Sequence, residues 1–372
     1  MPALPARRDF LHRSLALAAA ALLPAAEPDE QVIPFLDSRP FDPTNPRLPW
    51  EQTTSWLTPL EHFFWVGHYG YPEVDPAAWR LHIGGLVRNP RVLTLEQLQS
   101  RPKTELTLTL ECSGNPPAGG LVGNGRFAGT PLAPILEECG LPPEGIEVVF
   151  FGADRGSEKI RGGEYPQQFA RSLAVSDARR PDILLAWEMN RQPLTKEHGA
   201  PVRLVVPGWY GVAWVKWLER IEVQDRRFMG RFMGRDYVTI RGEQQGPGAV
   251  WRETSVGRMN LKSVVARVTR SPGGVVRIAG AAWSDGASIG GVEVRIDDGP
   301  WTPAQLSEGR DQPHAWKFWS LDWRNPAPGE HTLISRATDA SGKVQPAPED
   351  PFITLKKTYW EANQQAPRKI KV

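Results

Sequence analysis

Hydrophobic and polar positions alternate with short periods over the first two thirds of the chain. Leucines at every second position of residues 104–110 predict a strand with one buried face. Residues 132–139 have the apolar spacing of a short helix, and Gly140 supplies a helix stop. Further short strands are predicted at residues 79–86, 91–95, 147–151, 183–187 and 202–206.

The segments between these elements are rich in turn residues. Residues 27–60 are proline-rich and aperiodic, which predicts an extended arm with little regular structure. Thr94, followed by Glu96 and Gln97, has the pattern of a helix start. The strand over 104–110 runs into Glu111-Cys112-Ser113-Gly114-Asn115-Pro116-Pro117, so a cysteine lies where a strand passes into a loop.

The pattern changes from about residue 260 onward. Short strands are predicted at residues 264–268, 275–281, 292–296, 318–321 and 332–336, separated by glycine-containing turns. This spacing is typical of an immunoglobulin-like β-sandwich, whose role taken alone is structural. We place the boundary near residues 245–260, at Gln245-Gly246-Pro247-Gly248, and divide the chain into domains 27–255 and 256–372.

The first domain has the pattern of an α+β fold. It shows no regular alternation of strands and helices, and no G-x-G-x-x-G follows a strand, which argues against a doubly wound nicotinamide-binding domain. The expected fold is therefore an α+β domain followed by an all-β immunoglobulin-like sandwich.

Composition and charge exclude several classes of function. Of 372 residues, 40% are hydrophobic and 15 are tryptophan, which is enough to build a substantial core. Two cysteines rule out a disulfide framework, and no C-x-x-C-H is present for covalent haem. A formal charge of +2 without a long Lys/Arg run argues against nucleic acid and membrane-surface binding.

Residues 1–26 have the features of an export signal. Arg7-Arg8 precedes Phe10-Leu11, an apolar stretch over 14–23, and Pro24-Ala25-Ala26. The adjacent arginines resemble a twin-arginine signal, and an ordinary secretory signal is the alternative reading. Twin-arginine export carries folded proteins, commonly with a cofactor already inserted. We therefore expect a periplasmic protein that holds a cofactor.

Two groups of residues are candidates for chemistry. The thiolate of Cys112 is a soft metal ligand at a strand end, although a lone cysteine is often only a small buried hydrophobe, as we expect for Cys139. His198, Arg203 and Lys216 surround a central strand and have the character of an anion or phosphate cradle. Each of these three residues taken singly is also compatible with a place on the surface.

Motifs in this order resemble those of the sulfite oxidase family of molybdenum enzymes. In the first domain they are Leu110-Glu111-Cys112-Ser113-Gly114-Asn115, Leu185-Ala186-Trp187-Glu188-Met189-Asn190, His198-Gly199-Ala200-Pro201-Val202-Arg203, Val215-Lys216-Trp217-Leu218 and Arg235-Asp236-Tyr237. In the second domain Asn260-Leu261-Lys262-Ser263, Ala282-Trp283-Ser284 and Trp316-Lys317-Phe318-Trp319 resemble the family's immunoglobulin-like dimerisation domain. The similarity spans nearly the whole chain after residue 26.

The resemblance implies a molybdenum-molybdopterin cofactor, with no haem in this chain. It implies that Cys112 is the metal-binding thiolate and that Tyr237 is the active-site tyrosine. The residues implied to grip the pterin and its phosphate are His68, Asp154, His198, Arg203 and Lys216.

The chain departs from the resemblance where sulfite-oxidising members have three arginines. Val66, Pro117 and Ser288 stand at those places. Because charge-assisted contacts to a small dianion in a partly dry site are strong, we expect this change to weaken sulfite binding. Nearby arginines that offer a substitute are Arg126, Arg155 and Arg161.

The expected function is oxidation of sulfite, or of a related sulfur substrate, by oxo transfer. Electrons would pass to an external acceptor such as a c-type cytochrome, and the sandwich implies a homodimer. One alternative keeps the cofactor but acts on a sulfane sulfur or a sulfoxide. Another, from a different class, is a non-catalytic extracytoplasmic binding protein, against which the retained Cys112, His198, Arg203 and Tyr237 argue.

Overall fold

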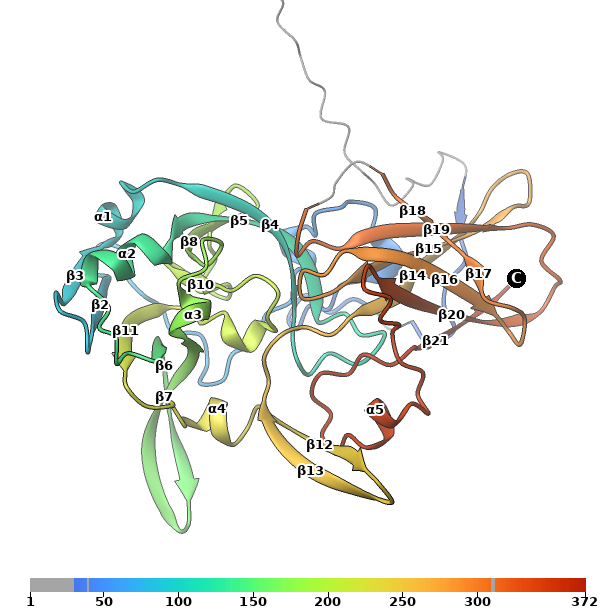
Figure 1. Ribbon diagram of the computed structural model, residues 1–372. Helices are drawn as coiled ribbons and strands as arrows, with labels where there is room; N and C mark the ends of the chain where they lie inside the picture. Colours follow the sequence, from blue (N-terminus) through green and yellow to red (C-terminus); the bar gives the residue numbers. More distant parts are fainter. Residues whose placement is uncertain (1–29, 39, 309–311) are drawn as a thin grey trace, which may run out of the picture.

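A computed structural model describes residues 30–38, 40–308 and 312–372. The proposed export signal over residues 1–26 lies outside the described residues. Two bodies lie side by side, the first built from the cyan-to-yellow part of the chain and the second from the orange and red part (Figure 1). No helix among the described residues is long and apolar enough to cross a membrane.

One five-stranded sheet of the first domain carries the cysteine loop. Its strands run in the order β10-β8-β5-β4, all antiparallel, with β9 beside β8. Pairing of β4 with β5 ends at Glu111 and Val122, so the chain between them forms a loop that begins with Cys112. The bounds are β4 Thr104–Glu111, β5 Val122–Pro131, β8 Leu184–Met189, β9 Gln192–Pro193 and β10 Arg203–Val205.

A second five-stranded sheet has the order β3-β2-β11-β6-β7. In this sheet β2 and β11 are parallel, and the other pairs are antiparallel. The long strands β6 and β7 extend beyond the sheet as a projecting hairpin (Figure 1). The bounds are β2 Arg80–Gly85, β3 Arg91–Thr94, β6 Glu147–Ile160, β7 Gly163–Ala174 and β11 Leu218–Gln224.

The helices of the described chain are short and lie at the ends of strands. The Thr94 hydroxyl accepts from the Gln97 amide and the Gln97 side chain accepts from the Thr94 amide, which confirms the expected helix start. The predicted helix over 132–139 is also confirmed, and its stop Gly140 has φ +72°. The bounds are α1 Leu95–Gln99, α2 Leu132–Cys139, α3 Val175–Ala178, α4 Arg231–Gly234, α5 Pro351–Thr354, η1 Trp50–Gln52, η2 Leu60–His62 and η3 Gly211–Ala213.

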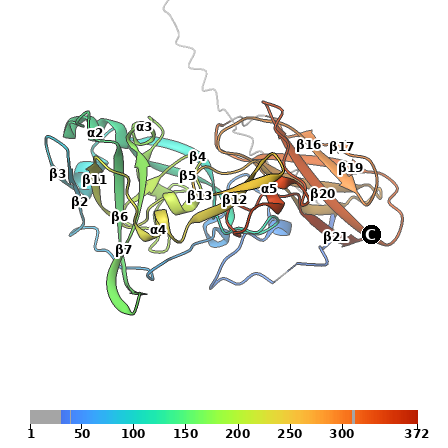
Figure 2. The ribbon, with the colours of Figure 1, turned by 60° about the horizontal axis from the view of Figure 1, so that its bottom comes forward.

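A hairpin lies where the sequence analysis placed the domain boundary. Strand β12 (Val238–Gln245) pairs with β13 (Gly248–Ser255), and the residues between them close its turn. Glycine at position 246, with φ +58°, suits that turn. The hairpin and α5 lie beside each other between the two bodies (Figure 2). An isolated antiparallel β-bridge pairs the backbone of Arg241, in β12, with that of Lys356, just after α5.

The second domain is a sandwich of two antiparallel sheets, as the strand spacing predicted. One sheet has the order β1-β14-β15-β19-β18 and the other β17-β16-β20-β21. Strand β1 comes from the N-terminal arm, which otherwise forms little regular structure, as expected. The bounds are β1 Gln31–Val32, β14 Lys262–Arg270, β15 Val276–Trp283, β16 Ile289–Ile296, β17 Thr302–Pro303, β18 Gln305–Leu306, β19 Lys317–Trp323, β20 Glu330–Asp339 and β21 Pro367–Lys371.

The main hydrophobic core crosses from the first domain into the second. Trp283 and Trp316 of the sandwich belong to the same buried cluster as Phe127 of the first domain. The Trp316 indole donates to the Trp56 carbonyl, and the Trp56 indole donates to the Trp316 carbonyl. The sandwich also has a smaller core of its own. The two domains therefore share one packed interface.

This interface alters the expected burial of β4. The alternating leucines predicted one exposed face, but residues 107–111 are all buried. The Thr109 amide donates to the His314 carbonyl, and the Thr109 hydroxyl accepts from the Trp316 amide. The polar face of this half of β4 is therefore covered by the second domain rather than by water.

Candidate active site

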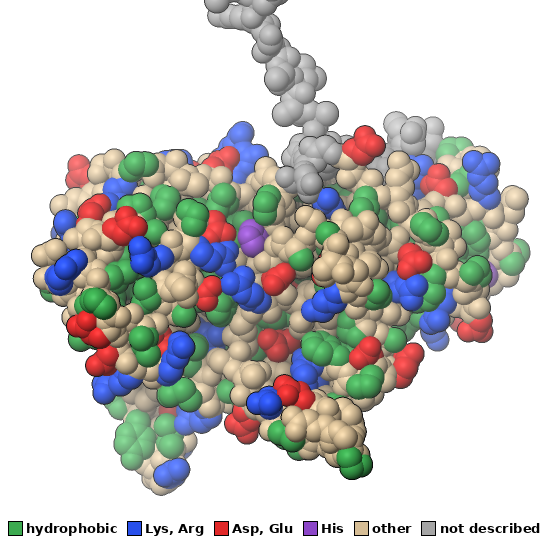
Figure 3. Space-filling view, in the orientation of Figure 1, with side chains coloured by type: hydrophobic (Ala, Val, Ile, Leu, Met, Phe, Trp, Pro, Cys, Tyr) green, Lys and Arg blue, Asp and Glu red, His purple; other side chains and the backbone are tan. Residues whose placement is uncertain are grey.

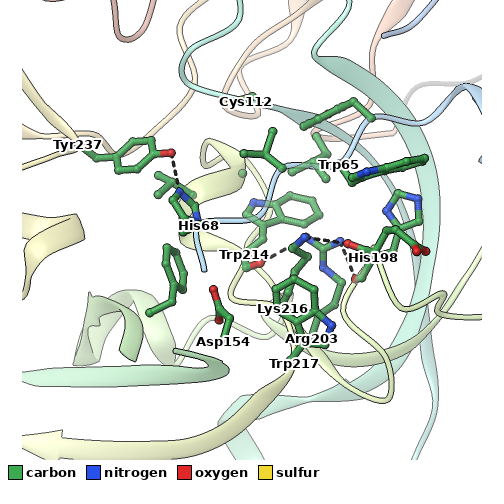
Figure 4. A pocket seen from close by; sticks show the side chains of 17 residues that line it. Trp65, His68, Cys112, Asp154, His198, Arg203, Trp214, Lys216, Trp217 and Tyr237 are labelled. Atoms are coloured by element: carbon green, nitrogen blue, oxygen red, sulfur yellow. Dashed lines mark hydrogen bonds between the residues drawn. The ribbon is translucent and has the colours of Figure 1, made fainter. Parts of the chain in front are cut away.

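All seven residues that the sequence singled out line one pocket of about 610 Å³. Figure 4 shows Cys112 and Tyr237 on one side of this pocket and Lys216 and Arg203 on another. The seven are Cys112, Tyr237, His68, Asp154, His198, Arg203 and Lys216. Because they come from separate loops and strands, only the fold brings them together.

The loop after β4 presents Cys112 to the pocket. The Cys112 amide donates to the Leu121 carbonyl at 2.9 Å, and its carbonyl accepts from the Asn115 amide at 2.9 Å. The Asn115 side chain donates to Glu111 and accepts from the Leu121 amide, which closes the loop across its base. Burial raises the pKa of the Cys112 thiol. In contrast Cys139 is fully buried in α2, as expected for a small hydrophobe.

Tyr237 and His68 form a hydrogen-bonded pair. The phenol oxygen lies 2.7 Å from His68 Nε2, as the dashed line in Figure 4 marks. The imidazole stacks on the ring of Phe169, with centroids 4.5 Å apart. Burial lowers the pKa of His68 to about 4, so this ring is neutral near pH 7. His68 therefore contacts the tyrosine predicted to be catalytic.

Arg203 is a buried cation without a counter-ion among the described residues. Its guanidinium donates to the carbonyls of His198 and Trp214, while its Nε has no partner there. Only 3% of the side chain is exposed, and burial lowers its pKa to about 9. A buried charge of this kind needs an anion to balance it.

Lys216 lies beside Arg203 in the same part of the pocket. Its Nζ donates to the Glu197 carbonyl at 2.7 Å and lies 4.1 Å from the Trp217 ring centroid. Burial and then the charge of Arg203 lower the pKa of Lys216 to about 7. Glycine is required at position 199, where φ is +98° and a Cβ would lie 2.7 Å from Lys216 Cβ.

Asp154 supplies an acceptor to this region. Its side chain is 2% exposed, and Oδ1 has no hydrogen-bond partner among the described residues. Burial raises the pKa of Asp154 to about 6. An unpaired carboxylate oxygen close to Lys216, in a pocket that Arg203 also lines, fits a ligand with both a phosphate and heterocyclic N–H donors. The residues present therefore fit a phosphorylated pterin.

The three positions at which family arginines were expected lie in different parts of the structure. Val66 lines the pocket, whereas Pro117 does not, and Ser288 lines a different pocket beside His314. The candidate substitutes also lie elsewhere. Arg126 pairs with Glu105, Arg155 pairs with Glu219, and Arg161 lies in the turn between β6 and β7. Arg203 is the single arginine in the lining of this pocket, among the residues that the structure describes.

Sequence reasoning missed most of the apolar lining and one aromatic contact. The missed lining residues include Phe64, Trp65, Phe169, Val212, Trp214 and Trp217. Their signal was the density of aromatic residues around His68 and Lys216. Nothing in the pattern indicated that Trp360, over a hundred positions later, stacks on Tyr237.

Family models match both domains. The oxidoreductase molybdopterin binding domain matches residues 68–232, and the Mo-co oxidoreductase dimerisation domain matches residues 254–360. Sulfite oxidase from Gallus gallus is 32% identical over 81% of this chain and 70% of that protein. The chain belongs to the sulfite oxidase family. The family's two-domain fold is thus confirmed for this chain.

Two further sulfite oxidases and one solved structure are similar to most of this chain. Sulfite oxidase from Arabidopsis thaliana is 30% identical over 82% of this chain and 86% of that protein. Mitochondrial sulfite oxidase from Rattus norvegicus is 32% identical over 86% of this chain, which spans 62% of the rat protein's length. The crystal structure of the sulfane dehydrogenase SoxCD from Paracoccus pantotrophus superposes with a TM-score of 0.74, at 29% identity over 92% of this chain and 90% of that chain.

Proposed function

We propose that this protein is a molybdenum-molybdopterin oxidoreductase that oxidises sulfite or a related sulfur substrate. One observation carries the proposal. The candidate thiolate, tyrosine and cofactor-binding residues, predicted from separate motifs, all line the same pocket of about 610 Å³. Membership of the sulfite oxidase family supports the same conclusion.

In this proposal four residues of the pocket hold the cofactor. Arg203 and Lys216 would hold the cofactor phosphate, whose negative charge balances two buried cations. Asp154 Oδ1 would accept from the pterin, and the Cys112 thiolate would bind the metal. When bound, the molybdenum centre supplies a transferable oxo group and takes up two electrons.

Tyr237 would contact the substrate, and His68, which the family resemblance implies as a pterin contact, is hydrogen-bonded to this tyrosine. The tyrosine hydroxyl can donate to the neutral His68 Nε2 or accept from it, and in either case its direction is fixed. Oxidation of sulfite with one water gives sulfate, two protons and two electrons. A fixed phenol at this point orients the substrate, and the neutral imidazole adds no positive charge.

A second candidate is oxidation of a sulfane sulfur, favoured by Val66. This residue lines the pocket where sulfite-oxidising members are expected to have an arginine. A sulfur substrate with a small or distant charge does not need that arginine. The similar fold of a sulfane dehydrogenase supports this candidate, and reduction of a sulfoxide is tested alongside it.

The proposal extends to location and partners. An export signal over residues 1–26 of twin-arginine type would place the loaded protein in the periplasm. Electrons would leave to an external acceptor such as a c-type cytochrome. The second domain, which matches the family's dimerisation domain, supports a homodimer. Mixed positive and negative side chains on the face in Figure 3 are consistent with a protein that does not bind nucleic acid.

The test uses protein expressed in a host that makes molybdopterin. We expect about one molybdenum per chain by mass spectrometry and sulfite-dependent reduction of ferricyanide in the wild type. Cys112→Ser should abolish turnover, whereas the matched control Cys139→Ser should retain it, because Cys139 lies in α2 away from the pocket.

Substrate panels separate the candidates. Turnover with thiosulfate but not sulfite would favour a sulfane substrate. Enzyme-dependent reduction of a sulfoxide, with reduced methyl viologen as the electron donor, would favour a sulfoxide substrate. Folded wild-type protein without molybdenum would overturn the enzyme proposal and would favour the alternative, a non-catalytic binding protein.

A further inference from the structure

Tyr237 is held from two sides by residues of different domains. On one side its hydroxyl meets His68 at 2.7 Å. On the other, the Trp360 ring stacks on the phenol, with centroids 4.4 Å apart and planes 30° apart. Trp360 lies in the region that matches the dimerisation domain. The phenol is therefore enclosed between the first domain and the second.

The segment that carries Trp360 is anchored to the cysteine loop. The Glu361 amide donates to the Ser113 carbonyl at 2.7 Å, one residue after Cys112. The Glu361 carboxylate accepts from the Thr239 hydroxyl at 2.6 Å, close in sequence to Tyr237. The Lys356 ammonium donates to the Trp360 carbonyl at 2.5 Å. These contacts fix the peptide group between Trp360 and Glu361, directly after the indole.

Packing against Gly114 fixes the aromatic side chains themselves. A Cβ at this position would lie 3.3 Å from the Tyr359 ring and 3.4 Å from the Trp360 ring. The Tyr359 ring in turn packs against Trp360 at a tilt of 38°, with centroids 4.0 Å apart. The absence of a side chain at Gly114 thus lets two second-domain rings lie directly on the loop of Cys112.

Tyr237 also separates two hollows. A basin of about 1110 Å³ lies outside the inner pocket, and its walls include Tyr359, Trp360 and Arg235. Among the residues that the structure describes, His68 and Tyr237 alone line both hollows. The orientation of the Tyr237 ring therefore affects the opening between the inner pocket and the basin. Trp360 contacts that ring from the basin side.

We infer that Trp360 is a positioning residue: it holds the Tyr237 phenol in the orientation needed at the inner pocket, so that the second domain completes the active site. The inference rests on the proposed function for its catalytic consequence. Its structural part, that Trp360 sets the orientation of Tyr237, does not depend on whether a cofactor is bound. A stacked indole restricts ring rotation without taking part in hydrogen bonding, which leaves the hydroxyl for His68.

The first test reads the tyrosine directly in cofactor-free protein. The chain has six tyrosines, so 3-fluorotyrosine labelling gives a simple fluorine NMR spectrum, in which Tyr237→Phe identifies the resonance of residue 237. We expect Trp360→Leu to shift and broaden that resonance, and Trp360→Phe to restore most of its sharpness. A matched control is Trp251→Leu, at an exposed tryptophan of β13, which should leave it unmoved.

The second test uses the loaded enzyme. We expect Trp360→Leu to lower kcat about tenfold or more with unchanged molybdenum content, and Trp360→Phe to recover most of it. In a Tyr237→Phe background, Trp360→Leu should cause no further loss, because its effect passes through the phenol. Gly114→Ala, whose Cβ would lie 3.3 Å from the Tyr359 ring and 3.4 Å from the Trp360 ring, should shift the same fluorine resonance.

The outcomes are separable from those of the proposed function. An unchanged Tyr237 resonance in folded Trp360→Leu protein would overturn the inference even if the enzyme is active. Full additivity of the two substitutions in kcat would overturn it as well. If the wild type proves inactive on every sulfur substrate, the proposed function fails while the NMR result still decides whether Trp360 positions Tyr237.

Discussion

The ammonium of Lys262 lies 2.5 Å from a carboxylate oxygen of Glu111, and both side chains are fully buried. Glu111 directly precedes Cys112, and Lys262 begins β14 of the second domain. The other Glu111 oxygen accepts from the Trp283 indole at 2.8 Å. Two residues of the sandwich thus bind the residue next to the candidate metal ligand, which ties the geometry of the cysteine loop to the interface.

Loss of Lys262 should therefore destabilise the whole protein. Lys262→Met leaves the Glu111 carboxylate buried without its cation, and we expect the free energy of unfolding to fall by about 3–5 kcal/mol. Urea denaturation measures this. The control is Arg252→Ala, which removes an ion pair with Glu243 that is about half exposed, and we expect it to cost no more than about 1 kcal/mol. Equal effects of the two substitutions would contradict this account.

Loss of Arg203 should destabilise the cofactor-free protein much less than loss of Lys262. Arg203→Met removes hydrogen bonds to two carbonyls but also removes a buried charge without a counter-ion. We expect the free energy of unfolding to fall by no more than about 1–2 kcal/mol, because these effects offset each other. Pterin and molybdenum content should drop strongly in the same variant. Retained cofactor with a large loss of stability would show that Arg203 is structural.

Lys216 should make the stability of cofactor-free protein depend on alkaline pH. Its pKa is about 7 in the folded state against 10.5 as the ordinary value, so between these pH values the unfolded chain binds more protons. The free energy of unfolding therefore rises as pH increases from about 7 toward 10. Urea midpoints across this range should rise less steeply in Lys216→Met. Lys196→Met, at a half-exposed lysine, is the control and should keep the wild-type slope.

An arginine in place of Val66 should favour sulfite. The side chain at this position lines the inner pocket, where a guanidinium would meet a small dianion in a partly dry site. We expect Val66→Arg to lower KM for sulfite by about tenfold, which corresponds to about 1.4 kcal/mol of binding. Val66→Met, of similar length but without charge, is the control. An equal change of KM in both variants would assign the effect to shape rather than charge.

Local sequence patterns were sufficient for elements whose cause is local. The helix at Leu132–Cys139 follows from its apolar spacing and from Gly140, and the capping pair of Thr94 and Gln97 is readable in four residues. Strands β5, β7 and β11 were missed because their residues lack a clean alternation, since both faces of β5 are largely buried. The residues at the predicted domain boundary close the hairpin of β12 and β13, two strands that the sequence analysis did not predict.

The sequence alone determined which residue types are available and the order of the motifs that carry the family resemblance. It named Cys112, Tyr237 and the cradle of His198, Arg203 and Lys216, because these lie in recognisable local motifs. Only the tertiary structure decided that Arg126, Arg155 and Arg161 lie outside the pocket and that Trp360 stacks on Tyr237. The reason is that such contacts join residues far apart in the chain, whose approach is set by the packing of whole domains rather than by any local pattern.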